Sequence, residues 1–417
     1  MSQITLQPGK IKGTVSVPPS KSLAHRAIIC ASLAKGKSII SNVEYSKDIE
    51  ATISCMQSLG TQIKKYDDYL EIDGTHTYSK ENCLMNCEES GSTLRFMIPI
   101  SLVHSVNLHY IGKGKLGQRP LGVYYEIFDD QNISYSYKEN VLDLYINGQL
   151  HSGEYSLPGH ISSQFITGLL FSLPLLEGDS KIIITSKLES VGYIDLTLQM
   201  LRLYGIEIVY KENIFYIKGN QSYKCGNYRI EGDYSQAAFY LVAGALGNDV
   251  IVEDLNMESA QGDKEIIDLL KRMGCTFIPS GNGYKMVADS LKAIDIDASQ
   301  CPDIIPVLAL ACAVSQGYSR IYNAGRLRIK ECDRLSATVE VLKNLGIEAI
   351  EKEDEMIIKG GKIIGGCVSS YNDHRMAMME AIASTVSTSP ITIDNKECVR
   401  KSYPSFWDDF KMLGGKI

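Results

Sequence analysis

The sequence predicts an α/β repeat fold of six similar units, arranged as two globules of three units each. Three observations support this prediction. An amphipathic helix recurs along the chain, each copy ends in a hydrophobic residue followed by glycine, and short β-rich runs flank each copy. The helix-ending glycines stand at positions 60, 205, 274, 346 and 414. This is a spacing of about 70 residues with one double gap, which favours repeated units over the chance recurrence of strands and helices.

Each unit has the same expected order of elements: a β-rich run, the amphipathic helix, glycine, and two short alternating strands. The i, i+3, i+4 spacing of apolar residues indicates helices that bury one face. The expected helices cover residues 49–59, 121–128, 196–203, 266–273, 335–345 and a last stretch that ends at 413. The expected strands include residues 38–40, 69–72, 141–146, 182–184, 214–217, 250–252, 284–287, 320–322 and 356–358.

Composition places the chain among ordinary globular proteins. It has 417 residues, 44% hydrophobic and 22% charged, with a net charge of −7, so neither nucleic acid nor an anionic membrane is an expected partner. No signal peptide and no apolar run long enough to span a membrane is recognised. The eleven cysteines are scattered without a CxxC pair, which favours reduced thiols, no metal site and a cytoplasmic location.

We expect a domain boundary near Cys225-Gly226-Asn227. The first globule would span residues 14–227. The second would span 228–417 together with 1–13, on the expectation that the first strand, with Ile4 and Leu6, pairs with the later half. Two short crossovers would then form a hinge, and clefts between domains are common sites for small molecules.

Four stretches of the first half combine cations or hydroxyl groups with an expected helix entry or loop. They are residues 17–26 (VPPSKSLAHR), 88–95 (EESGSTLR), 117–122 (GQRPLG) and 158–165 (PGHISSQF). Backbone N–H groups at a helix N-terminus, with Lys or Arg beside them, are suited to a phosphate or a carboxylate. The first stretch lacks the glycines of a P-loop. The alternative is a set of capped surface helices with solvated cations.

The second half carries denser charge clusters. They are residues 326–335 (RLRIKECDRL), 371–378 (YNDHRMAM) and 400–406 (RKSYPSF). The first two lie directly before or at the start of an expected helix, so they are more than a solvated face. Asp303 opens an apolar stretch after Pro302, and its carboxylate is either a helix N-cap or a base aimed at a ligand.

Taken in order, these blocks resemble the 5-enolpyruvylshikimate-3-phosphate synthase family of enolpyruvyl transferases. The resemblance covers essentially the whole chain. It rests on Ser20-Lys21-Ser22 with His25-Arg26, Arg119-Pro120, Ser162-Ser163-Gln164, Lys330-Glu331 with Asp333-Arg334, Asp373-His374-Arg375, and Arg400-Lys401. It implies a two-domain inverse α/β barrel of six βαβαββ-type repeats, three per domain, with a cleft between the domains.

The resemblance also implies a reaction. The enolpyruvyl group of phosphoenolpyruvate would pass to the 5-hydroxyl of shikimate 3-phosphate through a tetrahedral intermediate that loses phosphate. This is a step of chorismate and aromatic amino acid biosynthesis and a target of glyphosate. A C–O bond breaks rather than a P–O bond, so no metal or other cofactor is expected. The resemblance further implies a cytoplasmic monomer.

Site residues follow from the resemblance, position by position. Phosphoenolpyruvate would contact Lys21, Gly91, Ser92, Arg119, Gln164, Arg334, Arg375 and Lys401. Shikimate 3-phosphate would contact Ser22, Arg26, Ser162, Ser163, Gln164, Ser190, Tyr193, Asp303 and Lys330. The implied catalytic residues are Asp303 as base for the hydroxyl, Glu331 as proton donor or relay, and Lys21.

Two departures from the family pattern and three rival readings remain open here. The family often has Asn-Ala-Gly-Thr where this chain has Glu89-Ser90-Gly91-Ser92, and Asn-Trp-Arg where it has Arg326-Leu327-Arg328. One rival is a UDP-N-acetylglucosamine enolpyruvyl transferase, a family with a reactive cysteine in the loop before Arg-Pro; residues 112–118 contain no cysteine. The others are a non-catalytic anion-binding repeat protein and a nucleic-acid end-processing enzyme, the latter disfavoured by the acidic balance.

Overall fold

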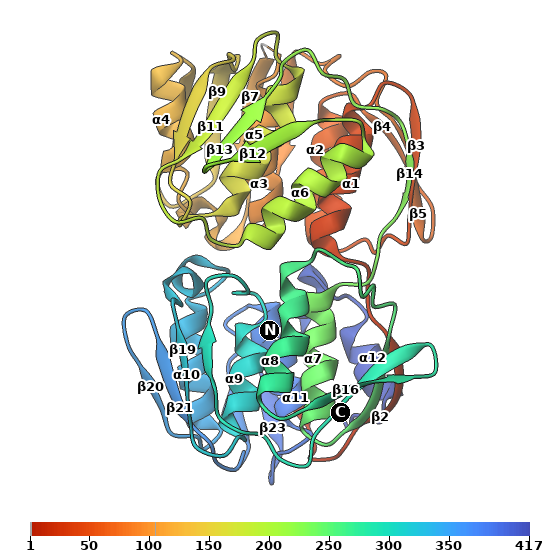
Figure 1. Ribbon diagram of the computed structural model, residues 1–417, viewed down its shortest axis with the longest axis vertical. Helices are drawn as coiled ribbons and strands as arrows, with labels where there is room; N and C mark the ends of the chain where they lie inside the picture. The colour runs from red at the N-terminus through yellow and green to blue at the C-terminus, as the bar shows by residue number, and fades with distance from the viewer. Residues whose placement is uncertain (1, 105) are drawn as a thin grey trace. The chain divides into compact units, whose positions relative to one another are not determined.

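The computed structural model describes residues 2–104 and 106–417. The chain forms two compact units (Figure 1). The first-half unit is Pro19–Ile230, and the second-half unit joins the chain up to Pro18 with Glu231–Ile417. Each unit contains three sheets among the described residues, so the six predicted repeats are seen as six sheets.

The sheets of the first-half unit share one pattern, in which two parallel strands are followed by an antiparallel hairpin. The strand orders are β14-β3-β5-β4, β6-β7-β9-β8 and β10-β11-β13-β12. Their bounds are β3 Lys37–Ser41, β4 Gln62–Lys65, β5 Tyr69–Asp73, β6 Asn82–Asn86, β7 Val106–Ile111, β8 Ser134–Tyr137, β9 Asp143–Gly148, β10 Glu154–Leu157, β11 Ser180–Ile184, β12 Ile208–Lys211, β13 Ile214–Ile217 and β14 Asn227–Arg229.

The second-half unit repeats the pattern in two four-stranded sheets and adds a three-stranded one. The orders are β16-β17-β15-β2, β18-β19-β21-β20 and β1-β23-β22. Their bounds are β1 Ile4–Leu6, β2 Lys12–Ser16, β15 Asp249–Glu253, β16 Thr276–Ser280, β17 Gly283–Val287, β18 Asp295–Asp297, β19 Tyr318–Tyr322, β20 Ala349–Glu351, β21 Met356–Lys359, β22 Gly366–Val368 and β23 Ile391–Ile393.

The N-terminal strands belong to the second-half unit. β1 runs antiparallel to β23, with Ile4 opposite Ile393, and β2 runs parallel to β15, with Val15 opposite Val252. Residues 14–18 therefore lie in the second-half unit, whereas the sequence-based boundary placed them in the first globule.

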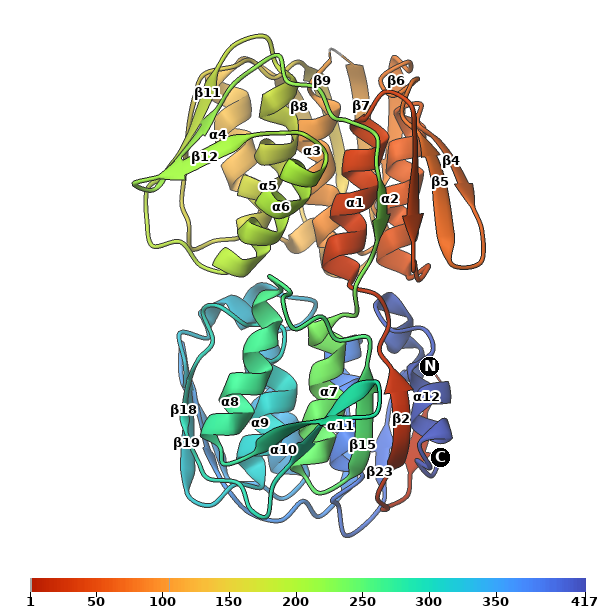
Figure 2. The same cartoon turned by 45° about the vertical axis from the view of Figure 1, so that its right-hand side comes forward.

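Each repeat contains two kinds of helix. The buried helices have apolar or small residues on nearly every face, and they are α1 Lys21–Leu33, α3 Gly91–Ser101, α5 Ser163–Ser172, α7 Tyr234–Ala245, α9 Ile305–Ala313 and α11 His374–Ala383. The others bury only part of their surface: α2 Lys47–Ser58, α4 Gly122–Asp130, α6 Val191–Leu203, α8 Ile266–Arg272, α10 Arg334–Asn344 and α12 Phe406–Met412. In each unit most of the helices lie side by side, and strands run along the outside of this group (Figure 2).

Sequence and structure agree on the repeat itself. The order strand, buried helix, strand, amphipathic helix and hairpin is the βαβαββ unit, seen in full from β6 through β9. The helix-ending glycines have φ values between +79° and +111° at Gly60, Gly205, Gly274, Gly346 and Gly414. Only glycine adopts this region without strain, which is why the sequence marked these helix ends. The five short helices are η1 Gly114–Gln118, η2 Leu173–Leu175, η3 Gly262–Glu265, η4 Gly325–Ile329 and η5 Lys396–Lys401. No described helix is long and apolar enough to cross a membrane.

Candidate active site

Helix entries carry most of the predicted site residues of the first-half unit. α1 begins at Lys21 behind Ser20, whose Oγ accepts the N–H of Leu23 at 3.5 Å. α3 begins at Gly91 behind Ser90. α5 begins at Ser163, and the Oγ of Ser162 accepts the N–H of Gln164 at 3.3 Å. The predicted serine caps are therefore present, and each leaves the first N–H groups of a helix available for an anion.

The entries of α3 and α5 are joined by a short chain of polar contacts. The Nε2 group of Gln164 donates to Ser92 Oγ at 2.9 Å, and Arg95 donates to Gln164 Oε1 at 2.8 Å. A second Arg95 nitrogen donates to the carbonyl of Pro120 at 3.2 Å. Arg95 thus fastens Gln164 and the loop after Arg119 to α3.

Arg119 lies directly against Gly91. A β-carbon built on Gly91 would stand 2.3 Å from an Arg119 terminal nitrogen, closer than real atoms approach. Glycine leaves room for the guanidinium in this position, and a larger residue would push the end of the Arg119 side chain away from the α3 N-terminus. The structure brings together Gly91, Ser92, Arg119 and Gln164, four residues that the resemblance assigned to one substrate.

A second group gathers Ser22, Arg26, Tyr193 and Ser190 at the contact of α1 with α6. Arg26 is 3% exposed and donates to the carbonyls of Ser22 at 2.7 Å and Tyr193 at 2.8 Å, and to Thr197 Oγ1 at 2.9 Å. Burial lowers the pKa of Arg26 to about 10, so it remains protonated at neutral pH. Ser190 caps α6 with φ +54°, a left-handed conformation that is uncommon for serine.

Lys21 has a fixed anionic partner. Its Nζ lies 2.9 Å from Asp48 Oδ2, and Asp48 is 4% exposed near the start of α2. The pair fixes the direction of the Lys21 side chain at the entry of α1.

The predicted residues of the second-half unit form one connected network centred on Arg334. Arg334 is 1% exposed and contacts three carboxylates. Its Nε lies 2.7 Å from Asp373 Oδ2, while its terminal nitrogens lie 3.0 Å from Asp303 Oδ1 and 2.6 Å from Glu331 Oε2. These carboxylates raise the pKa of Arg334 against the effect of burial, so its charge is permanent.

Asp303 is surrounded by cations. Lys330 lies 3.2 Å and Arg334 3.0 Å from Oδ1, and Arg375 lies 3.3 Å from Oδ2. Burial acts to raise its pKa, but Arg375, Lys330 and Arg334 outweigh burial and hold the pKa well below 3.8. The N-cap position of α9 belongs to Ile304, and Asp303 lies one residue before it, with its carboxylate among these cations.

The remaining cations surround the same carboxylates. Lys401, at the end of η5 and 7% exposed, lies 3.5 Å from Glu331 Oε1. Burial lowers the pKa of Lys330, against the opposing effect of Asp303. Glu331 is not a cap either, because Asp333 occupies the N-cap position of α10.

Sequence reasoning missed three residues that hold the predicted ones in place: Asp48, Arg95 and Asp373. Asp373 is fully buried, caps α11 through the N–H of Arg375 at 2.9 Å, and binds Arg334. The sequence named it only within the block Asp373-His374-Arg375, without a role of its own. Arg95 was visible as a charge within the otherwise buried helix α3, which is a signal that could have identified it, whereas Asp48 lies in the partly exposed helix α2 and gave no such signal.

The two departures from the family pattern are at Glu89, in the first-half unit, and at Arg326, in the second-half unit. A β-carbon on Gly114 would stand 3.1 Å from the Glu89 carboxyl group, so this side chain lies against η1. Lys113 stands directly before η1, and its pKa is raised by Glu88 and further by the charge of Glu89. Arg326 lies in η4 and acts to lower the pKa of Lys330.

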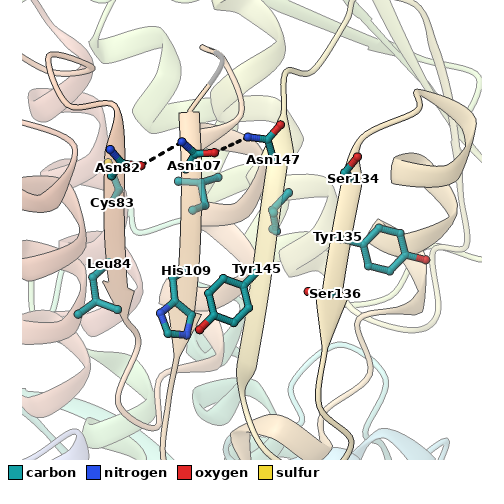
Figure 3. A pocket seen from close by; sticks show the side chains of 12 residues that line it. Asn82, Cys83, Leu84, Asn107, His109, Ser134, Tyr135, Ser136, Tyr145 and Asn147 are labelled. Carbon is teal, nitrogen blue, oxygen red and sulfur yellow. Dashed lines mark hydrogen bonds between the residues drawn. The ribbon is translucent and has the colours of Figure 1, made fainter.

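Two hollows lie on the first-half unit. One, of about 590 Å³, covers the outer face of sheet β6-β7-β9-β8, where Asn82, Asn107 and Asn147 form a hydrogen-bonded row beside His109 and Tyr145 (Figure 3). None of the predicted site residues lines it. The other, of about 220 Å³, lies beside η1 and includes Arg119. Among residues 2–104 and 106–417, no group of three His, Cys, Asp or Glu side chains could hold a metal ion.

Known proteins are similar to this chain in both sequence and fold. The family model described as EPSP synthase (3-phosphoshikimate 1-carboxyvinyltransferase) matches residues 6–410. The 3-phosphoshikimate 1-carboxyvinyltransferases of Clostridium botulinum (strain Alaska E43) and Clostridioides difficile (strain 630) are 56% and 54% identical to this chain, with 100% of this chain and 98% of each relative covered.

Solved structures of enolpyruvyl transferases have the same fold as this chain. EPSP synthase from Acinetobacter baumannii superposes with a TM-score of 0.82 at 25% identity, covering 99% of this chain and 98% of that one. The enolpyruvyl transferase NikO from Streptomyces tendae has the same fold, with a TM-score of 0.79 at 15% identity over 99% and 97% of the two chains. The sequence, the six-repeat architecture and the relatives lead to one conclusion: the chain belongs to the EPSP synthase (3-phosphoshikimate 1-carboxyvinyltransferase) family.

Proposed function

We propose that this chain transfers the enolpyruvyl group of phosphoenolpyruvate to the 5-hydroxyl of shikimate 3-phosphate, releasing phosphate. The observation that carries the proposal is the family match over residues 6–410, together with relatives of at least 54% identity whose names state this activity. The reaction is addition followed by elimination: the hydroxyl oxygen bonds to C2 of the enol, C3 gains a proton, and the tetrahedral intermediate loses phosphate.

Both substrates are anions, which explains why arginine and lysine dominate the residue set. In the first-half unit, Lys21, Arg119 and the α3 entry at Gly91–Ser92 would hold phosphoenolpyruvate, with Gln164 in contact with both substrates. The close approach of Arg119 to Gly91 supports this assignment, because it places a guanidinium beside free helix N–H groups. Ser22, Arg26, Ser162, Ser163, Ser190 and Tyr193 would hold shikimate 3-phosphate.

In the second-half unit, Arg334, Arg375 and Lys401 would hold phosphoenolpyruvate and Lys330 would hold shikimate 3-phosphate. Asp303 would take the proton of the 5-hydroxyl, since it is ionised and lies beside Lys330 at 3.2 Å. Its basicity would rise when substrate anions draw the surrounding cations toward themselves. Glu331 would deliver or relay the proton to C3, between Arg334 and Lys401.

We further propose that the protein works as a cytoplasmic monomer without a cofactor and without a nucleic-acid partner. The acidic net charge of −7 supports the last point. Light scattering of the purified protein at working concentration would test the monomer.

Phosphate release tests the function directly. One reaction contains phosphoenolpyruvate with shikimate 3-phosphate, and a second contains phosphoenolpyruvate with UDP-N-acetylglucosamine, both without added metal. We expect release only in the first. Release only in the second would support the rival transferase, although η1 has no cysteine for that chemistry. No release in either reaction from folded protein would support a binding protein instead.

A further inference from the structure

A buried row of hydroxyl groups connects α1, α2 and α3 in the first-half unit. His25 Nδ1 lies 2.7 Å from Thr52 Oγ1, which lies 2.7 Å from Thr93 Oγ1. Thr93 Oγ1 lies 2.8 Å from Ser90 Oγ and 3.3 Å from the carbonyl oxygen of Asp48. All four side chains of this row, His25, Thr52, Thr93 and Ser90, are at most 1% exposed. None of them was assigned to a substrate.

The hydrogen atoms of the row have one favoured direction. Burial lowers the pKa of His25 to about 3, so the imidazole is neutral and carries a single N–H. With that proton on Nδ1, His25 donates to Thr52, Thr52 donates to Thr93, and Thr93 donates to Ser90 or to the Asp48 carbonyl. The opposite direction would leave a buried Nε2–H without a partner, because His25 Nε2 makes no hydrogen bond in the described structure. An orphaned donor is rarer in proteins than an orphaned acceptor.

The row runs parallel to the ion pair between Lys21 and Asp48. His25 follows Lys21 by four residues on α1, and Thr52 follows Asp48 by four residues on α2. Residues four apart lie above one another on a helix, so two contacts one turn apart join α1 to α2. Together with the apolar packing of the two helices, these contacts orient α1 against α2.

Thr93 brings the entry of α3 to the same place. It is the third residue of α3, and it contacts both the Thr52 hydroxyl and the Asp48 backbone. The Thr52 hydroxyl is therefore the one group of the row that bridges α1 and α3 directly. A displacement of this hydroxyl would shift the α1 entry, which carries Lys21, relative to the helix N-terminus at Gly91–Ser92.

We propose that Thr52 is a positioning residue for the phosphoenolpyruvate-binding groups Lys21, Gly91 and Ser92. This inference rests on the proposed function. A purely structural role would appear as lost stability without a change in the kinetics of the folded enzyme, because valine keeps the shape of threonine but leaves the contacts to His25 and Thr93 unmade. Burying polar groups costs free energy unless each one is hydrogen-bonded. A fully bonded row of this kind holds the helix entries that carry Lys21, Gly91 and Ser92 in one fixed arrangement.

The test compares Thr52→Val, which removes the hydroxyl, with Thr52→Ser, which keeps it. In Thr52→Val we expect kcat/KM for phosphoenolpyruvate to fall about tenfold or more through a small displacement of Lys21, while KM for shikimate 3-phosphate changes less than about twofold. Thr52→Ser should keep most of the wild-type value. Thr338→Val is the matched control, since Thr338 is equally buried and its hydroxyl contacts only the Met376 sulfur at 3.7 Å among the hydrogen bonds described.

Wild-type turnover is measured first, so that a failure of the proposed function is recognised before any variant is compared. If the wild type is active, three results would overturn the inference. The first is unchanged kinetics in Thr52→Val, and the second is a KM for shikimate 3-phosphate that rises as much as the KM for phosphoenolpyruvate. The third is a fall of kcat/KM in Thr52→Ser as large as in Thr52→Val. If Thr52→Val does not fold, Thr93→Val removes the next hydroxyl of the row. The same comparison of kcat/KM for phosphoenolpyruvate with KM for shikimate 3-phosphate then tests the inference.

Discussion

Asp373 anchors the charge network of the second-half unit from a fully buried position, so Asp373→Asn tests the network directly. The aspartate gives Oδ2 to Arg334 Nε at 2.7 Å and Oδ1 to the N–H of Arg375 at 2.9 Å. Asparagine keeps the shape and the capping oxygen. It replaces the charged Oδ2 by an NH₂ group, which would face the N–H of Arg334.

The size of the effect follows from these contacts. Removing one partner of a buried ion pair typically costs about 3–5 kcal/mol, because the other charge stays buried. Arg334 keeps Asp303 and Glu331 as partners, so we expect the lower end, about 3 kcal/mol of unfolding free energy. Arg334 would also turn away from Asp373, and kcat/KM for phosphoenolpyruvate should fall by roughly 10- to 100-fold.

Denaturant unfolding and steady-state kinetics measure the two effects. Asp333→Asn is the matched control, because Asp333 caps the neighbouring helix α10 but is 39% exposed and pairs with the partly exposed Arg328. The unfolding free energy of Asp333→Asn should fall by about 1 kcal/mol or less, and its activity should be retained. Equal losses in the two variants, or an Asp373→Asn protein of wild-type stability and activity, would refute the reasoning.

Three further predictions concern single side chains. Lys21→Ala and Arg119→Ala should each reduce turnover by orders of magnitude in the phosphate-release assay, since each would remove a proposed charge-assisted contact to phosphoenolpyruvate; near-normal kcat/KM in both would show that the site is misplaced. Glu380 is fully buried, and burial with Asp394 and Asp373 raises its pKa well above 4.5, so its cost to folding grows as pH rises through the range above the unfolded pKa. Glu380→Gln should therefore raise Tm more at pH 8 than at pH 4.5, and an equal shift at both would contradict this. Burial raises the pKa of the Cys332 and Cys301 thiols, so both stay protonated; Cys332→Ser and Cys301→Ser should retain activity, and a strong loss in either would indicate thiol chemistry.

Much of the fold could be predicted because the partly exposed helices carry a clear period. α2 buries Ile49, Ile53 and Met56 along one face, and Gly60 ends the segment at φ +111°. The buried helices gave no such signal. Every residue of α9 and α11 is buried, so apolar positions occur on all faces and no single face stands out.

Several residues of the candidate site could be singled out because they lie at a helix entry. Lys21, Gly91 and Arg334 each begin a helix, and the sequence around a helix start is recognisable from its cap and its first apolar residues. Asp48 and Asp373 act through partners 27 and 39 residues away. Contacts between helices that are this far apart in the sequence depend on the packing of whole helices, which local sequence patterns do not encode.

The repeat explains why the cations stand where they do. In each unit the chain leaves a strand and enters a helix, and every such entry exposes N–H groups at the positive end of a helix dipole. The repeats therefore supply helix N-termini, two in each repeat, before any side chain is chosen. Arginine and lysine at these entries then add charge, while buried partners such as Asp48 and Asp373 fix the direction of Lys21 and Arg334. The carboxylates therefore matter as much for orientation as the cations do for binding, and replacing them should change specificity between the two substrates as well as stability.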